Sequence, residues 1–136
     1  MSTEIKETTN GKAFERWIWN LLDENQVNYE IEYQADGLNE EFSRIDVVLL
    51  DDTETPLEAI SLKYQEVKGT ADEKICFEAT SLSLMCLAHR MQRGTIVLAG
   101  EGWQSTKLHW YLNEYQTPSN VRIISYDEFV QEYIVN

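Results

Sequence analysis

The stretch SRIDVVLLDDTETPLEAISLKYQ, residues 43–65, constrains the fold of this chain more than any other. Two apolar runs of strand length lie on either side of the polar segment DDTETP. Apolar runs that flank a turn-forming segment are typical of a β-hairpin. We therefore predict strands over residues 44–50 and 57–65, paired about a turn near residues 53 and 54.

The charged residues of this hairpin gather at one place. Pairing about the turn puts position 46 opposite position 61, and side chains alternate between the two faces of a sheet. One predicted face is apolar and carries Ile45, Val47, Leu49, Ile60, Leu62 and Tyr64. The other face has polar residues at its open end, next to Arg44: Asp46, Ser61, Lys63 and Gln65. Half-buried strands seldom hold unpaired charges, so these groups either neutralise one another or form a site.

The rest of the chain alternates helical and extended patterns. Apolar spacings of three and four predict a helix over residues 11–25, and alternation predicts a strand over 27–33 with its aromatic residues on one face. The further predicted elements are a helix over 70–91, a strand over 95–99, a helix over 104–115, a strand over 121–125 and a helix from Asp127. The helix over 70–91 is apolar around most of its circumference, which predicts that it is well buried. The order αβββαβαβα predicts an α/β fold with a mixed central sheet flanked by helices.

Length and charge limit the function classes. A chain of 136 residues fits a single domain, which we predict over 1–136, with a core over about 11–100 and a C-terminal αβα extension over 101–136. The formal charge of −13 argues against a polyanion partner. However, residues 63–93 hold five basic and four acidic side chains, a net +1, which leaves −14 for the rest. One surface can therefore still meet a phosphate backbone, although such a stretch is equally typical of a solvated helix face.

The two cysteines and the N-terminal sequence indicate where in the cell the protein is expected. Cys76 and Cys86 are ten residues apart in one predicted helix, about 15 Å along its axis, so they cannot form a disulfide with each other. The polar start MSTEIKETTN lacks the apolar core of a signal peptide, and no apolar run is long enough for a membrane span. We expect a soluble, cytoplasmic protein with no membrane partner.

The polar end of the hairpin has the composition of a phosphodiesterase site. A carboxylate one strand away from a lysine, with short polar side chains between them, suits a divalent cation and an attacking water. The carboxylate binds the metal, and the ammonium steadies the nucleophile and the developing negative charge. A plain ion pair between Asp46 and Lys63 is the structural alternative.

At this point the sequence resembles the PD-(D/E)XK nuclease superfamily, which includes restriction enzymes, homing endonucleases and repair nucleases. The resemblance covers an αβββαβ core from Gly11 to Gly100. It rests on Phe14-Glu15 in the first helix, Ile45-Asp46 in the second strand and Ser61-Leu62-Lys63 in the third. It implies a restriction-endonuclease-like fold in which Asp46 binds Mg²⁺, with Mn²⁺ as a substitute, and in which Lys63 is catalytic.

The chain departs from the family pattern at Ser61, where a second carboxylate is expected. Part of the superfamily supplies a glutamate from the following helix instead, and Glu78 fits that role; an i,i+4 pair with Lys74 is the alternative for Glu78. Glu15 is the other candidate, or else a first-turn carboxylate that the helix dipole favours. Glu58 lies on the opposite face from Ser61. Gln65 either positions a water or phosphate or is an ordinary residue at a strand end.

These observations predict a function. We expect a Mg²⁺-dependent endonuclease that cuts double-stranded DNA at specific sites, as in homing or restriction, and that works as a homodimer or higher homo-oligomer. The candidate nucleic-acid contacts are Lys68, Lys74, His89, Arg90 and Arg93. The alternative is an acidic binding module without catalysis, of the immunity type or a degenerate nuclease relative, which the missing carboxylate at Ser61 favours.

Overall fold

A five-stranded mixed sheet is the centre of the structure, a computed structural model that describes residues 10–35, 44–65, 71–100 and 117–135, with residues 71–74 described by backbone alone. The strand order is β1-β2-β3-β4-β5. The strands are β1 (Tyr29–Gln34), β2 (Arg44–Leu50), β3 (Pro56–Tyr64), β4 (Arg93–Ala99) and β5 (Val121–Ser125). The helices are α1 (Gly11–Glu24), α2 (Ala71–Ala88), α4 (Tyr126–Phe129) and the π-helix η3 (Val130–Val135). The predicted helix over 104–115 lies outside the described residues.

The hairpin forms in the predicted register. β2 pairs antiparallel with β3 through Val47↔Ile60 and Val48↔Ala59, which continues to position 46 opposite position 61. The turn closes because Oδ1 of Asp51 accepts hydrogen bonds from the backbone N–H groups of Thr53, at 2.8 Å, and Thr55, at 2.9 Å. The polar segment DDTETP therefore closes the turn through its first aspartate. The register shifts by one residue between this turn and the rest of the ladder, since Leu49 pairs with Glu58 and Leu50 pairs with Pro56.

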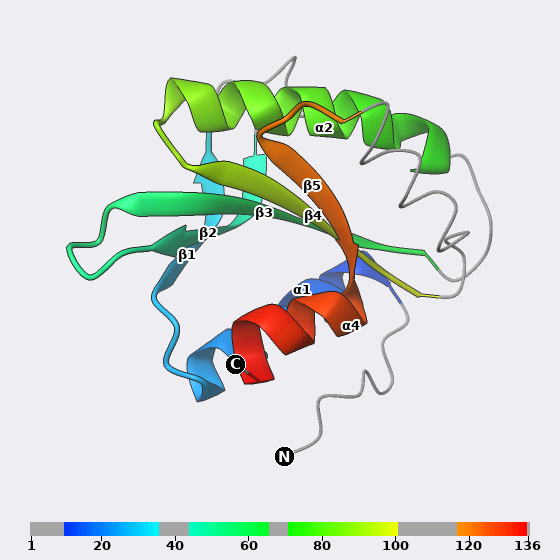
Figure 1. Cartoon of the computed structure of the whole chain (residues 1–136). Coiled ribbons are helices and arrows are strands. Elements are labelled where there is room, and N and C mark those ends of the chain that lie inside the picture. Colours follow the sequence, from blue (N-terminus) through cyan, green and yellow to red (C-terminus); the bar gives the residue numbers. More distant parts are fainter. Residues whose placement is uncertain (1–9, 36–43, 66–70, 101–116, 136) are drawn as a thin grey trace.

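The sheet lies between two helical layers. β3, β4 and β5 are parallel to one another, and α2 connects β3 to β4 across one face, while α1 and α4 cover the other face (Figure 1). Side chains of the central strands enter both layers: Ile96 packs on the α2 side, and Ile60 and Val97 pack on the α1 side, all at 0% exposure. The predicted α/β class with a mixed sheet flanked by helices is therefore confirmed.

The apolar stripe of α1 is buried as the spacing predicts. Phe14, Ile18, Leu21 and Leu22 face the sheet, and the side chain of Asn10 caps the helix by accepting a hydrogen bond from the N–H of Ala13 at 2.9 Å. Because Glu15 follows Phe14 directly, its side chain lies at the border of this buried stripe. The sequence of α1 therefore brings a carboxylate to the edge of the core.

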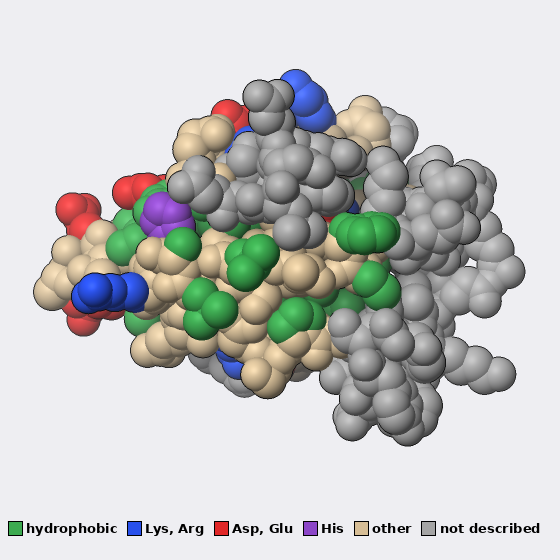
Figure 2. Space-filling view, turned by 90° about the horizontal axis from the view of Figure 1, so that it is seen from above, with side chains coloured by type: hydrophobic (Ala, Val, Ile, Leu, Met, Phe, Trp, Pro, Cys, Tyr) green, Lys and Arg blue, Asp and Glu red, His purple; other side chains and the backbone are tan. Residues whose placement is uncertain are grey.

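The outer face of α2 differs from the prediction that this helix is well buried. Phe77, Leu84 and Leu87 are 62%, 44% and 67% exposed, and Figure 2 shows apolar side chains along this surface. The opposite side of α2 packs on the sheet through Ala79, Leu82 and other buried residues. The difference arises because a helix that lies on one face of a sheet buries only one of its sides, whatever its composition.

The faces of β1 and β2 also differ from simple alternation. Tyr29 packs in the core on the α1 side, whereas Tyr33 packs on the α2 side, so the prediction that they share a face was wrong. Ile45, predicted beside Val47, packs on the α2 side as well. Glu32, between Tyr29 and Tyr33, has a φ of 51° in the left-handed region, which interrupts the pleat of β1. Ile45 lies opposite Tyr33 in the ladder and packs on the same side.

The C-terminal segment begins with a capping box. The Ser125 side chain accepts from the N–H of Glu128, and the Glu128 side chain accepts from the N–H of Ser125, both at 3.1 Å. The helix starts at Tyr126, one residue before the predicted start, and continues into η3. Of the helices that the structure describes, none is long and apolar enough to cross a membrane.

Candidate active site

The two strands of the hairpin separate at Asp46. Their ladder ends at Val47↔Ile60, and beyond that pair the backbone N–H of Leu62 donates to Oδ2 of Asp46 at 2.7 Å. β3 meanwhile continues along β4 as far as Tyr64↔Ala99. A carboxylate oxygen therefore satisfies an N–H group of β3 at the point where β2 turns away. This bond holds Asp46, which is only 8% exposed, in a fixed orientation at the opening of the sheet.

Glu15 of α1 lies beside Asp46, and one guanidinium group joins them. Nη2 of Arg44 donates to Oε1 of Glu15 at 3.1 Å and to Oδ1 of Asp46 at 3.0 Å. The side chain of Glu15 is 13% exposed and that of Asp46 is 10% exposed. Burial, and next the neighbouring Asp46, raise the pKa of Glu15 to about 7, against the opposing effect of Arg44. This carboxylate therefore changes its charge near neutral pH.

Lys63, Ser61 and Glu78 form a second group, on the α2 side. Nζ of Lys63 lies 3.1 Å from Oε1 of Glu78, and Oγ of Ser61 donates to the same oxygen at 2.8 Å. Glu78 thus points from α2 toward β3, and its side chain is only 17% exposed. A carboxylate from the helix meets the serine at the position where the family pattern has its own carboxylate.

Both candidate glutamates approach the predicted site, but they contact different members of it. Glu15 contacts the Asp46 group, and Glu78 contacts the Lys63 group; the N–H of Leu62, between Ser61 and Lys63, connects the groups through its bond to Asp46. Glu58 is on the opposite face from Ser61, as predicted, because it bonds Tyr133 on the α1 side.

The donor set suits a hard divalent cation. Carboxylate oxygens are the ligands that Mg²⁺ and Mn²⁺ prefer, and Oε1 of Glu15 and Oδ1 of Asp46 already share one cationic partner in Arg44. Within the described part of the chain, no three Asp, Glu, His or Cys side chains gather closely enough to hold a metal ion as they stand. A divalent cation held by Glu15 and Asp46 would therefore need further ligands, such as water or substrate oxygens.

The remaining candidates lie in several places. Gln65 follows β3, and its N–H donates to the carbonyl of Ala99 at 3.0 Å. His89 packs edge-on against Tyr33 at the far end of α2, eleven residues and about 16 Å from Glu78. Lys68 and the side chain of Lys74 are outside the described residues.

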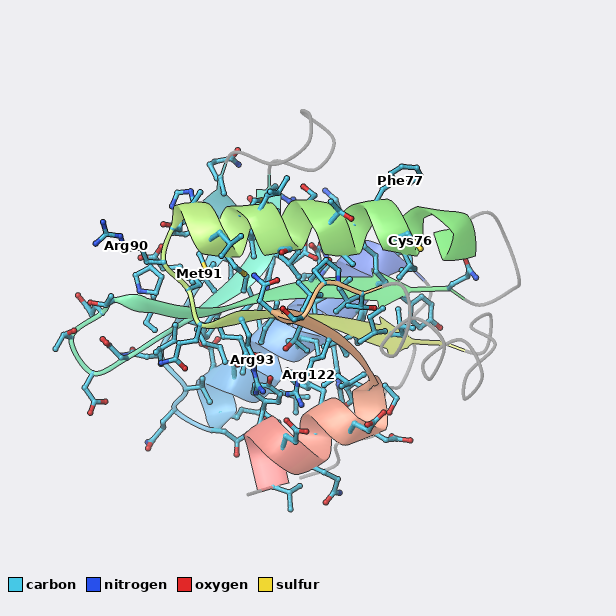
Figure 3. The ribbon with its side chains drawn as sticks, turned by 45° about the horizontal axis from the view of Figure 1, so that its top comes forward. Cys76, Phe77, Arg90, Met91, Arg93 and Arg122 are labelled. Atoms are coloured by element: carbon cyan, nitrogen blue, oxygen red, sulfur yellow. The ribbon has the colours of Figure 1, made fainter. Side chains whose placement is uncertain are left out.

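Arg90 and Arg93 do not share a surface. Figure 3 shows Arg90 at the end of α2 and Arg93 on the other side of the sheet, beside Arg122. Nε of Arg93 donates to Oε1 of Glu58 at 3.1 Å, so its charge is already paired. The structure therefore separates Arg93 from His89 and Arg90.

Sequence reasoning missed a buried polar network around Glu58. This carboxylate is 8% exposed and accepts from Arg93, from Thr95 at 2.7 Å, and from the hydroxyl of Tyr133 in η3. The available signal was a glutamate on the face of β3 that alternation assigns to the apolar core. The network attaches the C-terminal helix to the sheet on the face opposite α2.

Comparison with known proteins identifies the family. A model of the PD-(D/E)XK nuclease superfamily domain matches residues 1–133. The chain therefore belongs to the PD-(D/E)XK nuclease superfamily, and its fold is restriction-endonuclease-like, as the sequence predicted.

One solved structure and the curated proteins complete the comparison. The crystal structure of a repair endonuclease from Pyrococcus abyssi is similar, with 15% sequence identity and a TM-score of 0.43. The match covers 90% of this chain and 48% of that one, so this chain spans about half the length of that enzyme. No curated protein sequence matches the chain.

Proposed function

We propose that this protein is a metal-dependent DNA endonuclease that hydrolyses phosphodiester bonds at the opening between β2 and β3. One observation supports the proposal most directly. Asp46, held by the N–H of Leu62, lies on one side of this opening, and Lys63, paired with Glu78, lies on the other. Membership of a nuclease superfamily supports the same chemistry. Asp46 and Lys63 are residues whose roles the family pattern supplies, and both lie where β3 leaves β2.

Each side chain has a distinct task in this proposal. Asp46 holds Mg²⁺, or Mn²⁺ in its place, together with Glu78 or Glu15. The metal supplies Lewis-acid stabilisation of the phosphate and activation of water. Lys63 stabilises the negative charge that develops on the phosphate oxygens, and Ser61 holds Glu78 in position. Gln65 orients a water or a phosphate at the end of β3.

The substrate and assembly belong to the same proposal. We infer double-stranded DNA cut at specific sites, in homing or restriction, with phosphate contacts from Lys68, Lys74, His89 and Arg90. Arg93 is a weaker contact because Glu58 pairs with it. One site in a chain of 136 residues cuts one strand at a time, so a homodimer or larger homo-oligomer suits cleavage of both strands.

The test is cleavage of a randomised DNA pool with Mg²⁺ and with EDTA, read by sequencing of the ends. Asp46→Asn and Lys63→Met should each reduce cleavage by at least about a hundredfold, since each removes a charge used in the transition state. Lys12→Met, an exposed lysine at the start of α1, is the matched control and should cleave as the wild type does. Cleavage in EDTA, or by both site variants at the wild-type rate, would contradict the proposal.

A second candidate is an acidic binding module without catalysis. It is favoured by the pairing of every described charge at the site, since Arg44 pairs with Asp46 and Lys63 pairs with Glu78. Such pairing is also what a structural ion-pair cluster shows. Absence of cleavage on the whole pool in Mg²⁺ and Mn²⁺, with a folded protein, would favour this candidate.

A further inference from the structure

Arg44 stands out because its guanidinium group contacts the two carboxylates that the proposed function uses. Nη2 lies 3.1 Å from Oε1 of Glu15 and 3.0 Å from Oδ1 of Asp46, and Nη1 lies 3.6 Å from Glu32. Its side chain is 43% exposed, whereas those of Glu15 and Asp46 are 13% and 10% exposed. The guanidinium group of Arg44 is therefore much more exposed to solvent than the two carboxylates that it bridges.

The two oxygens of Asp46 have different partners. Oδ2 accepts the backbone N–H of Leu62 at 2.7 Å, which orients the carboxylate, and Oδ1 is left to face Arg44. Oδ1 is thus the oxygen that remains for a metal ion. A divalent cation binds carboxylate oxygens at ~2.0–2.6 Å. An ion on Oδ1 of Asp46 and Oε1 of Glu15 would compete with Nη2 for the same lone pairs, within a few ångströms of a like charge.

We infer that Arg44 is an internal counter-cation that competes with the divalent metal for Asp46 and Glu15, and so sets the affinity of the site for metal. The inference rests on the proposed function for the identity of the metal site. In the metal-free protein the guanidinium is the cationic partner of two largely buried carboxyl groups, whose negative charge is costly to bury without a partner. When the metal binds, Arg44 leaves these oxygens, and its planar donor group becomes available to a phosphate of the substrate.

The test measures metal binding without DNA and without turnover. Ca²⁺ and Mn²⁺ are titrated into the whole chain by isothermal calorimetry, with wild type, Arg44→Gln, Asp46→Asn and the control Arg16→Gln compared. Arg16 is an exposed arginine on α1, next to Glu15 in sequence. Arg16→Gln therefore removes the same net charge as Arg44→Gln. Arg44→Gln should bind the metal at least about tenfold more tightly than wild type, since it deletes charge-assisted bonds that the metal has to break. Arg16→Gln should change the affinity less than twofold.

A second variant at the same position, Arg44→Lys, tests the inference if Arg44→Gln does not fold. Arg44→Lys keeps the charge but cannot bridge two carboxylates with a planar donor group, so it should bind metal with an affinity between those of wild type and Arg44→Gln. In wild type, the ¹⁵N resonance of the Arg44 side chain should also shift on Ca²⁺ addition, while that of Arg16 stays in place.

The outcomes separate this inference from the proposed function. If Arg44→Gln and Arg44→Lys bind metal no more tightly than wild type, while Asp46→Asn abolishes binding, the metal site stands and the competition by Arg44 is refuted. If no variant binds metal, both the competition and the proposed metal site are refuted. Tighter binding by Arg44→Gln that Arg16→Gln reproduces would reduce the effect to net charge and would also refute a specific role for Arg44.

Discussion

Replacing Glu15 with glutamine should change how the stability of the metal-free protein depends on pH. The pKa of Glu15 rises from 4.5 to about 7 on folding, chiefly because the side chain is buried and next because Asp46 lies beside it. A carboxyl group with a raised folded pKa stabilises the native state fully below its unfolded pKa. That stabilisation is lost as the pH rises through the folded pKa. Wild type should therefore lose stability between about pH 4.5 and pH 7, whereas Glu15→Gln, which resembles the protonated form, should lack this component.

The size of the effect follows from the same values. At about 1.4 kcal/mol for each pKa unit, a rise from 4.5 to about 7 sets a ceiling of about 3 kcal/mol. Residual exposure of 13% makes 1 to 3 kcal/mol the expected range, since water screens part of the interaction; we take about 2 kcal/mol as the central value. Arg44 is present in both wild type and Glu15→Gln.

The assay is urea unfolding in EDTA at intervals from pH 5 to pH 8, with Glu15→Gln compared with wild type and with Glu24→Gln, an exposed glutamate of the same helix. The stability difference between Glu15→Gln and wild type should grow by about 1 to 3 kcal/mol toward pH 8, in favour of the variant. A difference that stays constant over this range would refute the reasoning, because the protonation of Glu15 would then not be linked to folding.

Three other perturbations test the packing and hydrogen bonding of the fold. Glu58→Ala should cost about 2 to 4 kcal/mol in urea unfolding, because it leaves the buried hydroxyl of Thr95 and the charge of Arg93 without their acceptor; a cost below about 1 kcal/mol would show that the network is not stabilising. Gly100→Ala should lower the melting temperature, at a cost of about 1 to 3 kcal/mol, because φ is 95° and the added Cβ would lie 2.3 Å from the carbonyl oxygen of Gln65. A thiol reagent at pH 8 should label the half-buried Cys76 well before Cys86, whose burial raises its pKa to about 11, and equal labelling rates would contradict the packing of α2 on the sheet.

Much of the fold follows from local patterns. The strand over 44–50 and the strand over 121–125 have the predicted bounds, and α1 ends one residue before the predicted end. These elements are well predicted because their periodicity agrees with their burial: the stripe of α1 that contains Phe14 and Ile18 faces the sheet. The pairing of Val47 with Ile60 was predictable for the same reason, because it keeps both apolar side chains in the core, whereas the one-residue shift between Leu49 and Leu50 was not predicted.

The errors occurred where a backbone feature has no periodic signal. The left-handed φ of Glu32 interrupts the alternation of β1 before Tyr33, and a glutamate in that conformation is not apparent from composition. The exposure of Phe77 and Leu87 depends on what lies beside α2 in space, which hydrophobicity alone does not report.

The members of the candidate site stay predictions, and the structure adds their contacts. Alternation predicts that Asp46, Ser61 and Lys63 share a face, whereas Arg44 joins Asp46 to Glu15 of α1, and Ser61 and Lys63 contact Glu78 of α2. The bridge from Arg44 to Glu15 joins residues 29 positions apart through a helix and a strand, so no spacing rule indicates it. The catalytic and metal-binding roles of the candidate site residues stay predictions.

The two carboxylate oxygens of Asp46 have different partners, and this affects how a substitution at this position is interpreted. One oxygen accepts the backbone N–H of Leu62, while the other faces Arg44 and is the oxygen that we propose binds the metal, so the same side chain has a structural contact and a proposed catalytic one. An alanine here would leave a buried amide without an acceptor and would confuse lost activity with a loosened sheet. Asparagine keeps an oxygen for the amide but turns a donor toward the guanidinium. Amide hydrogen exchange at Leu62 therefore gives a local report on whether an inactive variant has kept its architecture, which a circular dichroism spectrum of the whole chain would miss.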